Sequence, residues 1–304
     1  MKANAIMALA AAATLCGSVY AQEAAPQAES EAADEEDFPI SASFSVAVDS
    51  KYLSYGFVDN KDPIVTPSAE LTVFDFFTLG VEAIFDTTTY GRNHGGYGNR
   101  AGKYTELHPY AGISYALSPD DYEWLPTTIE LGLDYLYEYH PTVKGKHGDR
   151  DTANSEDSQF WTISVGLPDL WIEPVFTYER DVMRDNGTYL NLELGHTFEL
   201  TDSVTLRPSI AQGYGNKARV AAYACYYDED ADEDIGYHRY ALMDTVAKLE
   251  LTWSVCDNLE LSGYVAYSDF VFDSHMREAA RYYASPSVHN SYNFFGGVAA
   301  TLSF

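Results

Sequence analysis

The end of the chain, YNFFGGVAATLSF (residues 292–304), alternates apolar and polar side chains. Phe294 and Phe304 fall on one face of this segment, and Asn293 and Ser303 fall on the other. A period of two is that of a β-strand, because successive side chains point to opposite faces. The segment is therefore predicted to be a strand with one apolar face.

The same pattern returns about twelve times from Ser41 onward. In one example, Leu131 and Leu133 alternate with Glu130 and Gly132. The segments predict an all-β fold of about twelve strands, an even number as bacterial single-chain membrane barrels require.

The connections between these segments alternate in length. Short turns are expected at 75–76, 118–126, 168–169, 201–203 and 256–258. Long polar loops are expected at 56–62, 88–103, 140–157, 181–188, 213–240 and 269–291. Membrane barrels have short periplasmic turns and long outer loops. We therefore predict a transmembrane antiparallel up-and-down β-barrel over residues 40–304, with both chain ends on the periplasmic side.

A water-soluble β-sandwich is the alternative, but it would not confine its long loops to every second connection. Aromatic residues near strand ends suit the two membrane interfaces. They are Tyr52, Tyr55, Trp124, Tyr137, Tyr139, Trp161, Trp171, Tyr178, Tyr189, Trp253, Tyr267 and Tyr292. Four prolines fall within strand segments and are expected at rims or bulges, because proline removes a ladder donor. They are Pro67, Pro109, Pro174 and Pro208.

The N-terminus has the organisation of a secretory signal. Lys2 precedes an apolar stretch, and Val19-Tyr20-Ala21 forms a small-residue cleavage site. We predict a signal peptide at 1–21, with an anchor helix as the alternative. Residues 22–39 are acidic and carry few bulky side chains, which predicts a disordered periplasmic linker.

The net charge of -28 disfavours nucleic acid as a partner. Export and a barrel predict the cell outer membrane as the location. The expected partners are outer-membrane lipid, the barrel assembly machinery and small solutes, and no cofactor is expected. Cys225 and Cys256 are predicted to lie at opposite ends of the barrel, without a disulfide.

Two segments resemble known outer-membrane proteins. The last strand with its terminal Phe304 resembles the C-terminal signal by which outer-membrane barrels are recognised, which implies that Phe304 is an assembly signal. Residues 50–71, SKYLSYGFVDNKDPIVTPSAEL, resemble the opening hairpin of an uncharacterised family of bacterial outer-membrane proteins, with Tyr55 where that family has Arg. The architecture is also similar to that of small substrate-specific channels of twelve strands.

Titratable side chains gather on the inward faces of the predicted strands. A ring of carboxylates in a narrow channel favours cations. Twelve strands lie between a filled barrel of eight and a wide pore of sixteen, so a small aqueous channel is expected. The alternative is a sealed interior in which the carboxylates bond to Arg207, Lys248, Tyr and Ser. The predicted pore-lining residues are Glu70, Glu82, Glu106, His108, Glu130, Asp134, Glu173, Glu193, Arg207, Lys248, Glu250 and Glu260.

Catalytic and metal-binding patterns are weak. His196 and the pair Ser274-His275 are poor candidates for a lipid hydrolase. His108 beside Glu106 indicates a structural hydrogen bond more than a proton relay, and the histidines show no metal-ligand spacing. The acidic run at 228–234 is interpreted as a solvated loop. Neither an enzyme nor a metal site is expected.

The sequence thus favours a channel for passive diffusion of small hydrophilic solutes, with a preference for cations. The first alternative is a non-conducting surface protein that binds a partner or envelope component through its long extracellular loops. A lipid-modifying enzyme is the third hypothesis.

Overall fold

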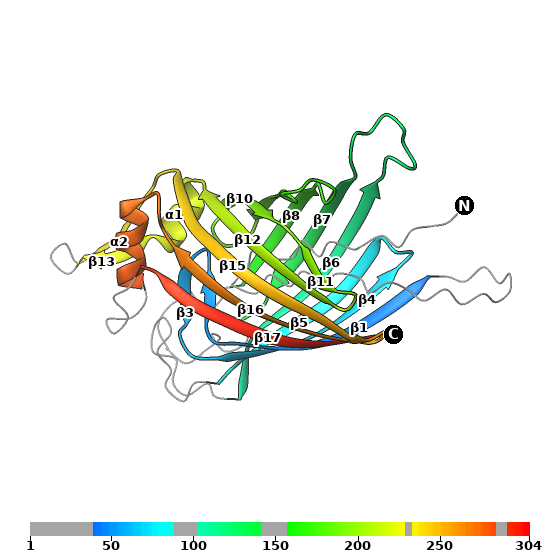
Figure 1. The fold of residues 1–304 in the computed structure, drawn as a ribbon. Coiled ribbons are helices and arrows are strands. Elements are labelled where there is room, and N and C mark those ends of the chain that lie inside the picture. Colours follow the sequence, from blue (N-terminus) through cyan, green and yellow to red (C-terminus); the bar gives the residue numbers. More distant parts are fainter. Residues whose placement is uncertain (1–38, 88–101, 141–156, 229–232, 284–290) are drawn as a thin grey trace, which may run out of the picture.

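The computed structural model describes residues 39–87, 102–140, 157–228, 233–283 and 291–304. The expected signal peptide and nearly all of the expected linker lie outside these residues, as does most of the expected acidic loop. The described part forms a barrel of long strands, with short helices and strands gathered at one end and the C-terminus at the other (Figure 1).

One antiparallel sheet makes the barrel wall. Each strand pairs with its sequence neighbour in the wall, and β1 pairs with β17, as Phe44 with Leu302, to close it. The strands are β1 (Ile40–Asp49), β4 (Ile64–Val73), β5 (Phe77–Asp86), β6 (Lys103–Leu117), β7 (Ile129–Glu138), β8 (Ser158–Gly166), β9 (Val175–Asp181), β10 (Thr188–Gly195), β11 (Phe198–Thr201), β12 (Val204–Gly215), β15 (Ala241–Cys256), β16 (Leu259–Asp269) and β17 (Asn293–Ser303).

These 13 segments make twelve strands in the described part of the chain, because β10 and β11 both pair with β12 and form one interrupted strand. The interruption lies opposite Pro208, which has no N–H to donate to a neighbour. The backbone N–H of His196 still donates to the carbonyl of Pro208 at 3.2 Å. The predicted fold class is confirmed.

The outer surface of the wall is apolar. Phe294, Val265 and Val298 are each more than half exposed, as befits side chains that face lipid. Exposed aromatic residues lie near both rims, with Trp171 and Trp253 toward the short turns and Trp161 and Tyr292 toward the long loops. The predicted alternation of lipid-facing and interior residues is therefore present.

The short turns lie at one rim, here called the short-turn rim. The Phe74–Phe76 turn and the two-residue turn at 257–258 are as expected. The apolar and polar alternation of the sequence continues through residues 170–179 and predicts a strand there. That prediction is wrong in its first half, because residues 168–172 form turns and β9 begins only at Val175. Glu173 therefore lies in a connection rather than on a strand, with a positive φ of 35°.

The β8–β9 connection is tied to the neighbouring β6–β7 connection at this rim. The backbone N–H of Thr128 donates to Asp169 Oδ2 at 2.8 Å. This donor favours the charged carboxylate, so it holds the pKa of Asp169 below its usual value.

The long connections are partly folded, which the sequence did not predict. They contain the hairpin β2 (Tyr52–Ser54) and β3 (Phe57–Asn60), the helices α1 (Lys217–Tyr223) and α2 (Ser274–Tyr283), and the pair β13 (Cys225–Asp228) and β14 (Glu233–Gly236). Asn216 caps α1 by accepting from the N–H of Arg219, and Asp273 accepts from the first turn of α2. No helix among the described residues is long and apolar enough to cross a membrane.

Two other expectations need correction. Pro67 and Pro109 lie inside β4 and β6 rather than at rims, and the pairing of each strand with one neighbour omits the proline position. Tyr52, Tyr55 and Tyr189 are buried, so they do not belong to a membrane interface.

Cys225 and Cys256 lie toward opposite ends of the barrel, as predicted. Cys225 begins β13 at the long-loop end, whereas Cys256 ends β15 at the short-turn rim. Cys256 is a free, exposed thiol.

The tip of the β2–β3 hairpin depends on Gly56. Tyr55 and Gly56 have φ of 52° and 86°, which is the left-handed pair of a tight two-residue hairpin turn. A Cβ at Gly56 would lie 2.6 Å from the Cβ of Asp244 and 2.8 Å from the ring of Phe270. The tip is thus held against the barrel wall by close packing.

We expect Gly56→Ala to destabilise the protein more than Gly102→Ala. Both glycines have positive φ, so both variants carry the left-handed penalty of about 1–2 kcal/mol. Only Gly56 also meets packed side chains, since no described residue lies within 4 Å of a Cβ at Gly102. Urea unfolding of the refolded barrel measures the difference, and equal losses would contradict a packed tip.

Candidate functional site: the capped barrel interior

The predicted pore-lining residues face the barrel interior, with one qualification. All but Glu173 lie on wall strands at positions that alternate with the lipid-facing side chains. Glu173 reaches the interior from its turn, where its carboxylate lies 3.4 Å from the Nε of Arg207.

Both interior cations that the sequence identified are paired with carboxylates. Arg207 binds Glu193 as well as Glu173. Lys248 donates from Nζ to Glu250 Oε2 at 2.6 Å, and both side chains are buried. On the side of the interior formed by β10, β12 and β15, the positive and negative charges of the side chains therefore largely offset each other.

The opposite side of the interior keeps unbalanced acidic groups. Glu70, Glu130 and Asp134 have no Lys or Arg partner among the described residues, although Tyr110 donates to Glu70 at 2.8 Å. These three residues, here called the acidic wall, lie on β4 and β7.

Inward glycines leave room for long side chains to lie flat on the wall. The ring of Tyr110 covers Gly80, and the carboxylate of Asp134 covers Gly112. The guanidinium of Arg207 covers Gly195 in the same way. This flat packing keeps the three side chains close to the wall.

The long-loop end of the interior is filled by a packed cap. The hairpin β2–β3 and the two helices bury Tyr55, Phe57, Val220 and Met276 against wall residues such as Met243. A second cluster packs Leu53 and Val58 of the hairpin on Ala266 and Phe295 of the wall. We call the hairpin, α1 and α2 the cap.

A buried arginine joins the cap to the wall. Arg219 of α1 is 1 % exposed and lies 3.0 Å from Glu179 Oε1 and 3.3 Å from Asp185 Oδ2. Its guanidinium stacks on Tyr55 at 4.5 Å, and the Tyr55 hydroxyl donates to Glu179. One network therefore connects α1, the hairpin tip and β9. No sequence pattern indicates this network, because Arg219 falls in what was expected to be a long polar loop.

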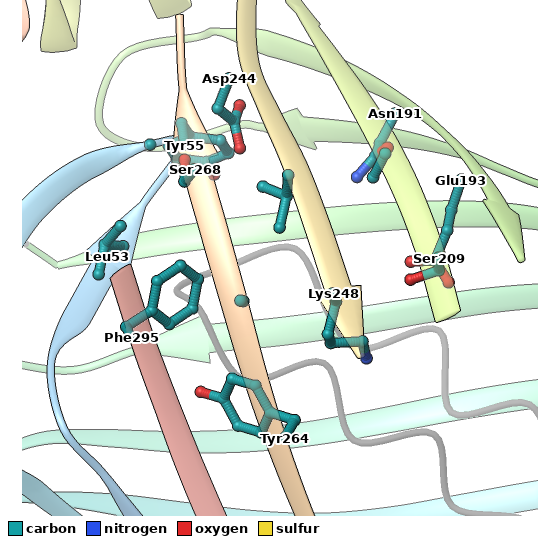
Figure 2. A pocket seen from close by; sticks show the side chains of 14 residues that line it. Leu53, Tyr55, Asn191, Glu193, Ser209, Asp244, Lys248, Tyr264, Ser268 and Phe295 are labelled. Carbon is teal, nitrogen blue, oxygen red and sulfur yellow. The ribbon is translucent and has the colours of Figure 1, made fainter. Parts of the chain in front are cut away.

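A cavity of about 60 Å³ lies between the hairpin and the wall. Leu53 and Tyr55 line it from the hairpin, while Lys248, Glu193, Asp244 and Phe295 line it from the wall (Figure 2). It therefore has an apolar side at the hairpin and a charged side toward the middle of the barrel.

Several histidines of the described residues lie beside carboxylates. His108 and His140 lie among carboxylates beneath the hairpin, with His108 Nδ1 3.3 Å from Glu82 and His108 Nε2 3.1 Å from Glu106. His196 packs on Trp171 at the short-turn rim and lies 3.5 Å from Glu173.

His275 contacts Arg239 and Asp273 near α2. In the described part of the chain, His196 and His275 thus contact carboxylates rather than a serine hydroxyl. This geometry does not assemble the nucleophile and base of a hydrolase.

The closed fold and the polar interior define the class of protein. A closed antiparallel barrel with an apolar exterior and a polar interior satisfies its backbone hydrogen bonds internally, as a membrane requires. The protein is therefore a transmembrane β-barrel of the outer-membrane type. Its exterior contacts lipid, whereas the role of the exposed Phe304 in assembly stays a prediction.

Comparisons with solved structures find other outer-membrane proteins. An outer-membrane channel from Pseudomonas putida F1 is 12% identical, over 90% of this chain and 100% of that one, with a TM-score of 0.48. The NanC porin is 8% identical, over 85% of this chain and 98% of that one, with a TM-score of 0.48. The outer-membrane protein OmpT of Vibrio cholerae is 12% identical, over 88% of this chain and 97% of that one, with a TM-score of 0.36.

No family model matches the chain. No curated protein matches it either. The resemblance of residues 50–71 to a particular family therefore stays a prediction.

We expect Arg219→Met to lower the free energy of unfolding by about 3–5 kcal/mol, because it leaves Glu179 buried without its cation. Adding Glu179→Gln should recover part of this loss. Arg239→Met is the matched control, since Arg239 also pairs with an aspartate but is 42% exposed, and it should cost less than about 1 kcal/mol. Urea unfolding followed by intrinsic fluorescence gives the free energy of unfolding of the wild type and of the three variants. A loss in Arg219→Met no larger than that in Arg239→Met would refute the anchoring role.

Proposed function

We propose that the protein is an outer-membrane channel for passive diffusion of small hydrophilic solutes, with a preference for cations. The observation that carries the proposal is the asymmetry of the interior charge. Arg207 and Lys248 are held by carboxylates, whereas the acidic wall has no basic partner among the described residues. A pore lined in this way attracts cations and repels anions.

The cap determines where a solute can pass. Because the hairpin packs on β15, β16 and β17, a solute that enters from the long-loop rim has to pass beside its tip or displace it. Solutes must therefore be small or the hairpin must move. A low conductance is expected for the intact protein.

Single-channel current in a planar bilayer under a salt gradient tests the proposal. We expect discrete steps and a cation-selective reversal potential. The combined variant Glu70→Gln, Glu130→Gln and Asp134→Asn should move that potential toward zero, because it removes the acidic wall.

The matched control removes three carboxylates from the β6–β7 connection. Asp120, Asp121 and Glu123 are all exposed there, so Asp120→Asn, Asp121→Asn and Glu123→Gln should change selectivity much less. Equal shifts in both combined variants would show that the acidic wall does not set selectivity.

Replacing hairpin residues 52–60 with a Gly-Ser linker should raise the conductance severalfold, because the linker cannot pack into the mouth. Heat-modifiable migration on a gel would show that the shortened protein still forms a barrel. Unchanged conductance of a folded variant would mean that the conduction path does not pass the hairpin.

The packed cap also favours a second function, a non-conducting surface protein whose folded outer elements bind a partner. Phe272 and Tyr240 are both more than half exposed beside the cap, where a partner could contact them. No current from the folded barrel, with or without the hairpin, would support this function instead.

A further inference from the structure

A Glu-x-His pair occurs twice, in consecutive strands. Glu106 and His108 lie on β6, and Glu138 and His140 lie at the end of β7. The Leu107–Tyr139 bridge is antiparallel, so it places Glu106 beside His140 and His108 beside Glu138. Register thus turns two sequence motifs into one cluster on the inner face of the wall.

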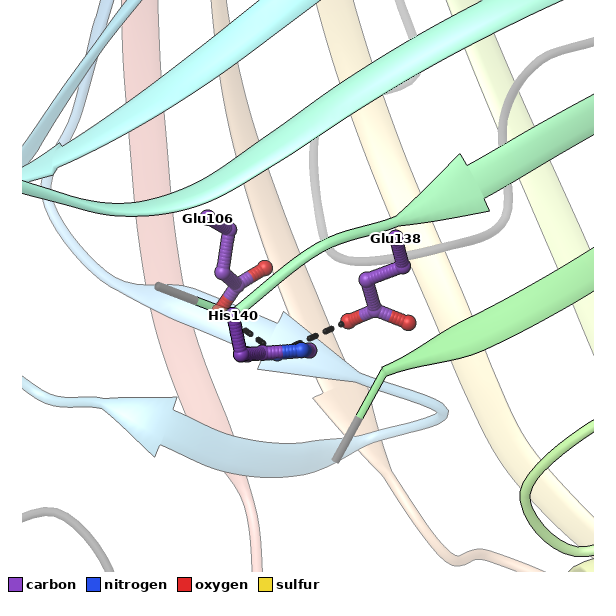
Figure 3. Close-up of side chains that lie close together, drawn as sticks. All are labelled: Glu106, Glu138 and His140. Carbon is purple, nitrogen blue, oxygen red and sulfur yellow. Dashed lines mark ion pairs between the residues drawn. The ribbon is translucent and has the colours of Figure 1, made fainter. Parts of the chain in front are cut away.

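The ligand atoms of Glu106, Glu138 and His140 converge (Figure 3). His140 Nε2 lies 3.3 Å from Glu138 Oε1 and 3.7 Å from Glu106 Oε1, and one atom from each residue falls within 4.8 Å of the other two. With bonds of about 2.0–2.1 Å, a tetrahedral metal site separates its ligand atoms by about 3.3–3.4 Å. The two histidine distances are close to that spacing.

The neighbours of the cluster hold its ligands in place. Tyr52 of the hairpin donates to Glu106 Oε2 at 2.6 Å, and His108 Nε2 contacts the same oxygen. Oε1 of Glu106 is left to face His140. The backbone N–H of His140 donates to Asp157 at 2.9 Å and fixes that residue from the other side. Metal ligands are commonly oriented by an outer layer of this kind.

His140 is buried, at 9% exposed, and directs Nε2 at the two glutamates. Nε2 is therefore the ring nitrogen available to a metal ion, and Nδ1 would carry the ring proton. A dication would also offset the charges of Glu82, Glu106 and Glu138, which lie close together here.

We propose that Glu106, Glu138 and His140 bind a divalent transition-metal ion of the zinc type, with a fourth position open to water. One imidazole and two carboxylates suit Zn²⁺, whereas Ca²⁺ takes six to eight oxygen ligands. Through Tyr52, which donates to Glu106, the ion stabilises the contact of the hairpin with β6. The proposal does not depend on the channel function.

The test uses the full chain, refolded in detergent and stripped with EDTA. Isothermal titration with Zn²⁺ should give a site of unit stoichiometry, and Zn²⁺ should raise the unfolding temperature of the wild-type protein, because a ligand that binds only the folded state stabilises it. Ca²⁺ at the same concentration should give neither effect. Equal responses to the two ions would overturn the proposal, because acidic segments bind both weakly.

Variants identify the ligands. His140→Gln and the isosteric Glu138→Gln should each weaken Zn²⁺ binding at least about tenfold, which corresponds to about 1.4 kcal/mol. His275→Gln is the matched control, because His275 also lies beside a carboxylate but is exposed, and it should bind Zn²⁺ like the wild type. If Glu138→Gln, folded by its heat-modifiable migration, keeps wild-type affinity, the assigned site is wrong.

Discussion

Closure of the hydrogen-bond ladder is the constraint on which the rest of the structure depends. Lipid offers no hydrogen bonds, so every wall strand must find partners on both sides. The pairing of β1 with β17 completes the ring, and closure divides the side chains into two populations. Phe294 and Val265 face lipid, while neighbours such as Ala266 and Phe295 face inward and are buried. The strand alternation and the polar interior both follow from this division.

The cap is stabilised by a different kind of interaction. A buried guanidinium is costly unless it is paired and hydrogen-bonded. Arg219 meets this need with Glu179, Asp185 and the face of Tyr55, and it thereby ties three separate segments together. The mouth of the barrel is thus narrowed by the packed side chains of the cap. Whatever passes through the interior must do so beside the hairpin or after it has moved.

The direction of single side chains could be predicted, but their partners could not. The alternation of side chains along a strand is enough to predict that Lys248 and Glu70 face inward, and both do so. The pairing of Arg207 with Glu173 depended on a turn that the sequence did not reveal, because alternation continued through residues that fold as a turn. The two Glu-x-His pairs are visible in the sequence, yet only the register of β6 against β7 brings Glu106 to His140.

The sequence by itself determined the barrel class, the strand number and the faces of the strands. These properties are local, because each strand repeats the same apolar and polar alternation and each connection shows its own length. Only the tertiary structure decided the fold of the long connections, the charge balance of the interior and the histidine–carboxylate cluster. They depend on contacts such as that of Arg219 with Glu179, between residues far apart in sequence, whose meeting is set by barrel closure and strand register.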